Sequence, residues 1–462
     1  MKKMIIYFLI GLGLFIVSCD DDEPGYAGAI VNFESSELGF DSGEATKTIT
    51  LQLSVVEDED TRIDLSVEDE GLIYGEDYQT NPEIEDNLLS LTVPAGSSRV
   101  SFVISKGADL FLSGDESVTF TITEVTSSVT VGGASVLKLS FSSIVSEGSE
   151  LTLNGGEGGS SAVNSVFVDF SNNEQTSVPR SGWDLGFYCG DEFRVILNNT
   201  TAAGAIALDK NDLALVTAGD TVDMNLAVSY ANPDALSLID NLNGDLDQTV
   251  TGEVSAADEE NRVYIVNRGV GGSTPSRAWK KIRILRNEET DGYILQYAGI
   301  EDLTYDTLHI DKNGNYNFRY VSFDDGHVLV EPEKDNWDIE WTGSIYSTSY
   351  GGADVAYYFA DMVFLNYLNK VTVAEVNISD IAYADFSESD INSLTFSSER
   401  DYIGSGWRVT TGSSIGVETD HYYIIKDPRD NYYKLKFINF VSDDGGTRGY
   451  PNIAYELVKK GS

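Results

Sequence analysis

The sequence predicts an all-β protein with little helix. Short segments such as TITLQLSV, RVSFVIS and KLKFINF alternate apolar and polar residues and end at Gly, Asn or Asp turns, as strands with one buried face do. No long segment shows a convincing apolar period of 3.6 residues. The best helical candidates, 233–243 and 256–261, are short, and 356–368 favours a strand because it is rich in aromatic and β-branched residues.

Composition limits the class of protein. A chain of 462 residues with 41% hydrophobic and 11% aromatic residues can form two to four domains with packed cores. Its net charge of −45 argues against nucleic acid as a partner, because phosphate binding needs a basic surface.

The first 18 residues have the pattern of a secretory signal peptide. Met1-Lys2-Lys3 is basic, 5–17 is almost wholly apolar, and Ser18 is small. The apolar segment is shorter than the roughly 20 residues that cross a bilayer, so 1–18 is expected to be removed on export.

Cys19 follows this segment directly. Ile16-Val17-Ser18-Cys19 resembles a bacterial lipobox, which implies that Cys19 is lipidated and anchors the chain in a membrane; a general signal peptide with an incidental cysteine is the alternative. The four acids that follow, within 19–27, form a solvated tether. They also resemble the acidic label of surface-exposed Bacteroidetes lipoproteins, which implies an outer-membrane location facing the exterior. With Cys19 lipidated, only Cys189 remains, and no intrachain disulfide can form.

The first folded domain is expected at 28–145. YGEDYQT (74–80), LTVPAGSSRVSFVI (91–104) and GDESVTFTIT (114–123) follow one another at strand-and-turn spacing. They resemble a Calx-β or related immunoglobulin-like sandwich. NGGEGGSS, 154–161, is a Gly-rich linker.

The Calx-β resemblance implies a possible calcium site. Calcium prefers carboxylate oxygens, and the matching positions are Asp77, Asp109 and Glu116. The family usually has a pair of acidic residues here, whereas Lys106-Gly107-Ala108-Asp109 supplies only one carboxylate. A solvated acidic loop is the alternative.

The rest of the chain contains an internal duplication. Trp183-Asp184-Leu185-Gly186-Phe187 recurs as Trp337-Asp338-Ile339-Glu340-Trp341, an offset of 337 − 183 = 154. Flanking segments repeat in the same order: VILN with VFLN, YIV with YII, and WKKIRIL with YYKLKFI. Two β-rich units are therefore expected, at 155–305 and 306–462, each ending in a β-hairpin.

The alternation in these motifs predicts core aromatics. One strand face would carry Trp183, Leu185 and Phe187, and the equivalent face would carry Trp337, Ile339 and Trp341. Asp184 and Asp338 are expected to bond a nearby amide in a turn or loop.

The ordered features W-D-[LI]-x-[FW], V-x-L-N and a closing strand-turn-strand such as YYIIKDPRDNYYKLKF resemble the HmuY family of Bacteroidetes lipoproteins. The resemblance implies an all-β protein that binds haem for iron acquisition, passes it to an outer-membrane haem receptor, and performs no catalysis. It also implies two axial ligands, histidine or methionine, to the haem iron.

The candidate haem ligands are few. None forms a ligand motif, and none aligns with the axial positions of the family; a tyrosine remains an alternative. After the signal peptide the histidines and methionines are His309, His327, His421, Met224 and Met362. His327 follows the turn Asp324-Asp325-Gly326 and is expected to be solvated, so the candidates are the other four.

Catalytic motifs are missing from the sequence. It has no P-loop, H-E-x-x-H or C-x-x-C, and Cys189 lies among acids that disfavour a thiolate. A second, non-catalytic function stays open: a structural or glycan-binding surface module that has kept the fold and lost the haem ligands.

Overall fold

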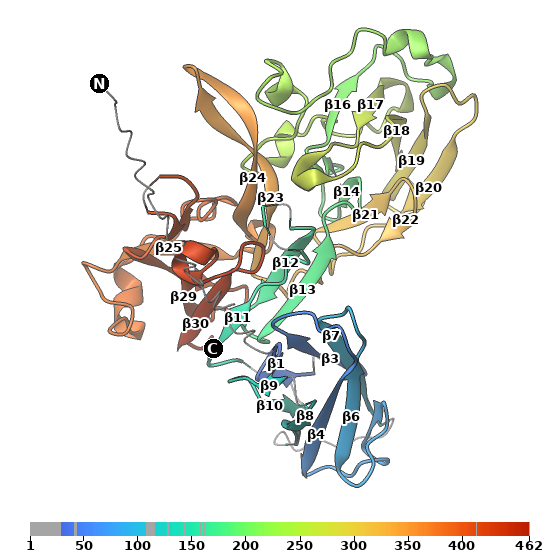
Figure 1. Cartoon of the computed structure of the whole chain (residues 1–462). Coiled ribbons are helices and arrows are strands. Elements are labelled where there is room, and N and C mark those ends of the chain that lie inside the picture. The colour runs from blue at the N-terminus through green and yellow to red at the C-terminus, as the bar shows by residue number, and fades with distance from the viewer. Residues whose placement is uncertain are drawn as a thin grey trace, which may run out of the picture.

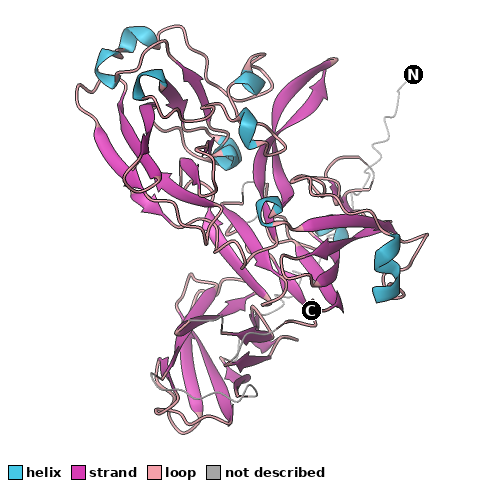
Figure 2. Ribbon diagram, turned by 180° about the vertical axis from the view of Figure 1, so that it is seen from behind, coloured by secondary structure: helices cyan, strands magenta, loops and turns pink. Residues whose placement is uncertain are grey.

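The computed structural model describes residues 29–40, 44–107, 116–126, 129–141, 145–157, 159–160, 162–412 and 414–461. The signal peptide, Cys19 and Asp109 lie outside the described residues. Regular structure in the described part is strands with a few short 3-10 turns (Figure 2), which confirms the all-β prediction. None of its helices is long and apolar enough to cross a membrane.

The N-terminal strands form a sandwich of two five-stranded sheets (Figure 1). One sheet has the order β5 (Tyr78–Asn81), β7 (Arg99–Lys106), β3 (Thr46–Leu53), β1 (Ile30–Phe33) and β9 (Thr130–Val131). The other has the order β2 (Glu37–Gly39), β10 (Val136–Ser140), β8 (Ser117–Val125), β4 (Thr61–Glu70) and β6 (Leu88–Val93).

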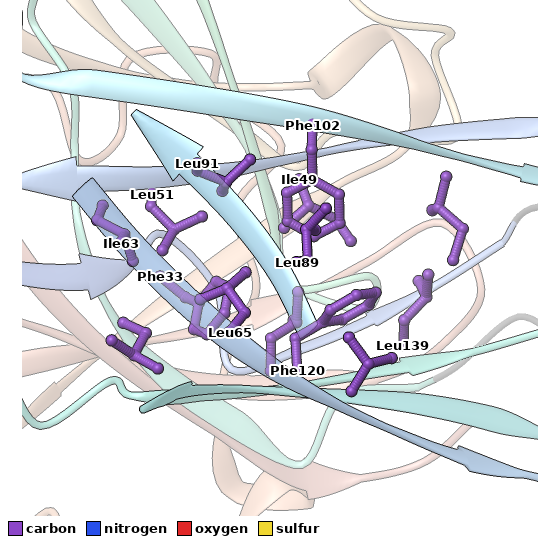
Figure 3. Packing of buried hydrophobic residues seen from close by; sticks show 14 of the residues in the cluster. Phe33, Ile49, Leu51, Ile63, Leu65, Leu89, Leu91, Phe102, Phe120 and Leu139 are labelled. Atoms are coloured by element: carbon purple, nitrogen blue, oxygen red, sulfur yellow. The ribbon is translucent and has the colours of Figure 1, made fainter. Parts of the chain in front are cut away.

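The period-2 pattern of these strands builds the core between the two sheets. Along β3, every second residue is buried, including Ile49 and Leu51, because successive side chains of a strand point to opposite faces. Phe102 and Phe120 meet from opposite sheets with ring centroids 4.9 Å apart, edge to face. Figure 3 shows these side chains converging on one interior.

The remaining strands form four sheets and one small ladder. Two are five-stranded: β11 (Gly148–Thr152), β30 (Asn452–Lys459), β29 (Tyr432–Asn439), β28 (His421–Lys426), β25 (Thr372–Asn377); and β16 (Gly204–Ala207), β17 (Val263–Asn267), β18 (Lys280–Asn287), β19 (Gly292–Gly299), β20 (Asp306–Ile310). Two are four-stranded: β13 (Glu174–Pro179), β12 (Asn164–Asp169), β23 (Ile339–Tyr350), β24 (Ala353–Leu365); and β15 (Val195–Leu197), β14 (Leu185–Tyr188), β21 (Phe318–Ser322), β22 (Gly326–Val328). A small ladder joins β26 (Arg408–Val409) to β27 (Gly416–Val417).

The duplicated halves are interleaved. β12 pairs with β23, and β14 pairs with β21, so each four-stranded sheet contains two strands from each half. The expected units at 155–305 and 306–462 are therefore not separate sheets, although equivalent strands recur in equivalent places. Their boundaries stay a prediction.

Two glycines of the Gly-rich segment, Gly155 and Gly159, bond the turn before β30. The N–H of Gly155 donates to the backbone carbonyl of Gly449 at 3.0 Å, and the N–H of Gly159 donates to the backbone carbonyl of Arg448 at 2.7 Å. A Cβ at position 155 would lie 2.1 Å from the Gly449 oxygen, so this approach requires glycine. The predicted linker is therefore bonded to the duplicated region in its described part, because β11 before it already pairs with β30.

The helical candidates are only single turns. Within 233–243 the structure has the 3-10 turn η4 (Ala235–Ser237), and within 256–261 it has η6 (Asp258–Glu260). Neither N-terminus has a side-chain cap bond, and short segments rich in Asp and Asn favour turns over helix. The segment around 356–368 is mostly strand β24, as predicted.

The sandwich contacts the duplicated region through β13 and the turn before it. Lys47 Nζ lies 2.6 Å from Glu174 Oε1. Asn173 Nδ2 donates to the carbonyl of Glu37 at 3.1 Å, and Ser35 Oγ donates to the carbonyl of Asn173 at 2.9 Å. These bonds link the first domain to a buried turn of the duplicated region.

Candidate functional site

Each W-D motif forms a hydrogen bond to the other half of the chain. Asp338 Oδ2 accepts the backbone N–H of Phe170 at 2.8 Å, and Asp184 Oδ2 accepts that of Phe323 at 2.8 Å. Phe170 and Phe323 are themselves equivalent, 153 residues apart (323 − 170). The two expected aspartate–amide bonds are thus reciprocal and lie across the interface of the halves.

The motif tryptophans repeat this reciprocity. Trp337 packs edge to face on Phe167, with centroids 5.1 Å apart, and Trp183 packs in the same way on Tyr320 at 4.9 Å. Both tryptophans belong to one buried cluster between the halves.

The expectation that each tryptophan shares a strand face with the next two apolar residues was wrong. Leu185 and Phe187 lie in one core cluster, and Ile339 and Trp341 lie in another. The strands begin only at Leu185 and Ile339, so the Trp-Asp pair before each strand does not follow its alternation.

The asparagine that ends each V-x-L-N motif holds its W-D segment. Asn198 Nδ2 donates to the carbonyls of Arg180 and Trp183 at 2.8 and 2.7 Å. Asn366 Nδ2 donates to the carbonyls of Lys334 and Trp337 at 2.7 and 2.9 Å. The repeated V-x-L-N motif marks both asparagines in the sequence. It did not indicate that they hold the W-D segments in place.

A cavity of about 110 Å³ lies between the two halves at this interface. Trp183 and Trp337 line it, and so do the rings on which they pack edge to face, Tyr320 and Phe167. One turn from the first half, including Leu242 and Leu246, closes part of the wall. Each half therefore contributes equivalent aromatic residues to the cavity.

Acidic side chains also line the cavity. Burial raises the pKa of Glu331 to about 8, against the opposing effect of the Phe318 and Asn317 N–H groups. Burial raises the pKa of Glu340, although Arg400 lowers it. Burial raises the pKa of Asp240 to about 6 while its carboxylate accepts the N–H groups of Leu197 and Val250. Each of these three groups accepts at least one hydrogen bond from the protein.

The structure does not bring the haem-ligand candidates together at this cavity. None of the four candidates lines it, and neither does His327. His309 is exposed on β20, and His327 is exposed on β22, in a different sheet. His421 on β28 bonds Asp420 and the Tyr423 hydroxyl.

The two methionines are more enclosed. Met362 on β24 is 1% exposed, and its Cε lies close to the turn at Gly404. Met224 is partly buried against the apolar cluster under the β16–β20 sheet. The motif aromatics Trp183, Phe187, Trp337 and Trp341 are all buried.

The calcium candidates are described only in part. Asp77 Oδ2 accepts the N–H of Ile73 at 2.8 Å, and Glu116 is buried at the start of β8. Among the residues that the structure describes, no three His, Cys, Asp or Glu side chains group as a metal site would require. Burial, more than the neighbouring acids, raises the pKa of the Cys189 thiol.

The fold and site define an all-β protein made of two interleaved halves that meet at reciprocal W-D motifs. The family model described as HmuY protein matches residues 161–455. This match spans both halves and more than half of the chain, so the chain belongs to the HmuY family, a family of binding proteins.

Comparison with other known proteins adds little. No curated protein matches. The apo form of the Calx CBD1 domain is 12% identical, with 25% of this chain and 96% of that chain covered and a TM-score of 0.22. A two-domain protein of unknown function from Bacteroides fragilis NCTC 9343 is 10% identical, with 73% and 90% covered and a TM-score of 0.20. The E. coli chaperone DraB is 12% identical, with 24% and 55% covered and a TM-score of 0.17.

Proposed function

We propose that this protein is a surface lipoprotein that binds haem for iron acquisition. Membership of the HmuY family carries the proposal. The anchor would be Cys19, and the acidic segment after it would tether the N-terminal sandwich. An outer-membrane haem receptor is the proposed recipient of the haem, and no step of catalysis is required.

Haem is too large for the cavity between the halves. Pockets for ligands of drug size are about 300–1,000 Å³, whereas this cavity is about 110 Å³. We therefore place haem elsewhere in the duplicated region, against the candidates His309, His421, Met224 and Met362. His309 can reach iron as it stands because it is exposed, while Met362 needs a local opening of the turn at Gly404.

A hemin titration of residues 20–462 tests the proposal. Ligation by imidazole or thioether should give a saturable Soret band. The same titration is run on His309→Ala, His421→Gln, Met224→Leu and Met362→Leu, since methionine-to-leucine exchange conserves volume in a packed site. Loss or displacement of the band in one of these variants identifies an axial ligand.

His327→Ala is the control for an exposed histidine on a different sheet. A flat titration of the parent chain contradicts haem binding. In that case a glycan array with reproducible hits would support the second function, a glycan-binding surface module.

A further inference from the structure

The hairpin of β23 and β24 projects beyond its sheet (Figure 1). Only residues 339–341 of β23 pair with β12, whereas the two strands of the hairpin pair with each other as far as Tyr350 and Ala353. One face of the projecting part packs on the first half, because Ile345 and Ala356 are buried there in a cluster with alanines of that half. The opposite face has a different composition.

Aromatic side chains occupy this opposite face. Tyr346 of β23 lies directly across from Tyr357 of β24, and both rings point away from the buried face because successive side chains of a strand alternate. Phe359 packs edge to face on both rings, with centroids 6.1 Å from Tyr346 and 5.5 Å from Tyr357. Tyr357 is 47% exposed, and the other two rings are half-buried. These three rings form the aromatic face of the hairpin.

Two carboxylates border the aromatic face. The Tyr346 hydroxyl donates to Asp401. Burial and the charges of Asp401 and Glu399 raise the pKa of Tyr346 to about 12, so both carboxylates lie near this ring. In the part of the chain that the structure describes, neither carboxylate forms an ion pair with a lysine or arginine. Aromatic ring faces and carboxylates both attract cations, so this surface is complementary to a basic group.

The outer edge of β24 beside the aromatic face is unpaired. β24 is the last strand of its sheet. Its C-terminal part is covered, since the N–H of Val363 donates to the carbonyl of Gly404 at 2.9 Å. Residues 353–359 have no backbone hydrogen-bond partner outside the hairpin among the described residues. Their sequence, ADVAYYF, lacks the lysine and proline with which proteins usually protect an exposed edge strand.

We propose that the aromatic face and the unpaired edge of β24 bind an extended basic segment of a partner protein. The segment would add a strand beside residues 353–359, because an unpaired edge is a template for an extended peptide. Its arginine or lysine side chains would lie on the rings of Tyr357 and Phe359 and near the two carboxylates. A second copy of the chain is a poorer occupant, because its net charge of −45 opposes association. The proposal does not rest on haem binding.

Fluorescence anisotropy with a labelled peptide, Thr-Val-Arg-Val-Lys-Val-Thr, tests the proposal on residues 20–462 at physiological ionic strength, which screens non-specific attraction. Binding of this peptide should saturate. The acidic peptide Thr-Val-Glu-Val-Asp-Val-Thr should not bind. The basic peptide methylated on its backbone nitrogens should bind about tenfold more weakly, because it keeps its charges but cannot donate hydrogen bonds to the edge of β24.

Variants of the surface are the second part of the test. Tyr357→Ala should weaken the basic peptide about fivefold, because it removes the most exposed ring of the aromatic face. Glu399→Gln should weaken it about threefold, because it removes one negative charge. Tyr305→Ala and Glu301→Gln are the matched controls and should leave the affinity unchanged. Tyr305 is 45% exposed, Glu301 is exposed, and both precede β20.

Three results would overturn the proposal. The first is no saturable binding of the basic peptide. The second is equal affinity of the parent chain for the methylated peptide, or of Tyr357→Ala for the unmethylated one. The third is a dimer of the parent chain that Tyr357→Ala breaks, measured by analytical ultracentrifugation, since it would assign the face to a second copy. The peptide assay contains no hemin, so its result is separate from that of the hemin titration.

Discussion

Asp184 and Asp338 accept equivalent backbone hydrogen bonds, but a cation lies beside Asp184 and carboxylates lie near Asp338. Asp184 pairs with Arg268 at 2.8 Å, and Arg268 also contacts Asp324 at 2.6 Å. Among the described residues, no lysine or arginine forms an ion pair with Asp338. Burial raises its pKa, and the nearby carboxylates of Asp169 and Asp427 raise it further. Asp184 thus lies in a buried ion pair, whereas the surroundings of Asp338 favour its neutral form.

This difference predicts unequal effects of the same substitution. Asp184→Asn should destabilise the protein by about 3 kcal/mol, because it leaves the buried Arg268 without its main partner. Asp338→Asn should be neutral or stabilising near neutral pH, because an amide oxygen can still accept the Phe170 N–H without a buried charge. Thermal unfolding of both variants and the parent measures this. Equal losses in the two variants would contradict it.

The raised pKa of Glu331 predicts a pH dependence. Its folded pKa of about 8 lies above the ordinary 4.5, so the folded state binds the proton more tightly than the unfolded state. The stability that this proton contributes is complete below about pH 4.5 and is lost as the pH rises through 8.

Glu331→Gln should therefore match the parent near pH 5 and be more stable than the parent by a few kcal/mol at about pH 9. Denaturant unfolding at both values measures the difference. Glu333→Gln, an exposed acid two residues away, is the control and should show no such gain. A gain of equal size at both values would rule out titration of Glu331 as the cause.

At the scale of elements, the structure shows which strands pair, and the sequence predicted only some of these pairings. The hairpins β18–β19 and β28–β29 were predictable, because turn residues separate two alternating segments. The pairing of β12 with β23 joins segments about 170 residues apart. No local pattern encodes such a pairing, because it depends on which apolar faces meet in the folded chain.

Interleaving predicts how the chain responds to a single cut. A protease site inserted between Leu303, which is 86% exposed, and Thr304 separates the two halves covalently. The cleaved protein should still elute as one native species, because both four-stranded sheets contain strands of each half, and should separate only in denaturant. Size-exclusion chromatography before and after cleavage is the measurement, with the uncut insertion variant as control. Separation in native buffer would show independent units.

At the scale of the whole molecule, the N-terminal sandwich lies against one end of the duplicated region, at the bottom of Figure 1. Its contacts with Asn173 and Glu174 fix it to the duplicated region. If Cys19 is lipidated as proposed, the sandwich is the first folded domain after the anchor along the chain. The net charge of −45 favours solubility of the folded chain through mutual repulsion.

The anchor makes a direct prediction for fractionated cells. Cys19→Ala should move the protein out of the membrane fraction, because acyl chains at about 0.8 kcal/mol per buried methylene provide the attachment. Cys189→Ala should stay in the membrane fraction, since this partly buried thiol lies in the folded region. Immunoblots of the fractions measure both. A membrane-bound Cys19→Ala protein would contradict the anchor.

The sequence by itself determined the all-β class, the duplication with its repeated W-D and V-x-L-N motifs, and the family resemblance, because alternation, turn residues and repeats are local features. Only the tertiary structure decided that the halves exchange strands, that each tryptophan leaves its strand's face to pack on the other half, and that Trp337 and Arg400 meet at one cavity. These depend on contacts between distant segments, where burial and hydrogen bonding select one arrangement among many that the local pattern permits.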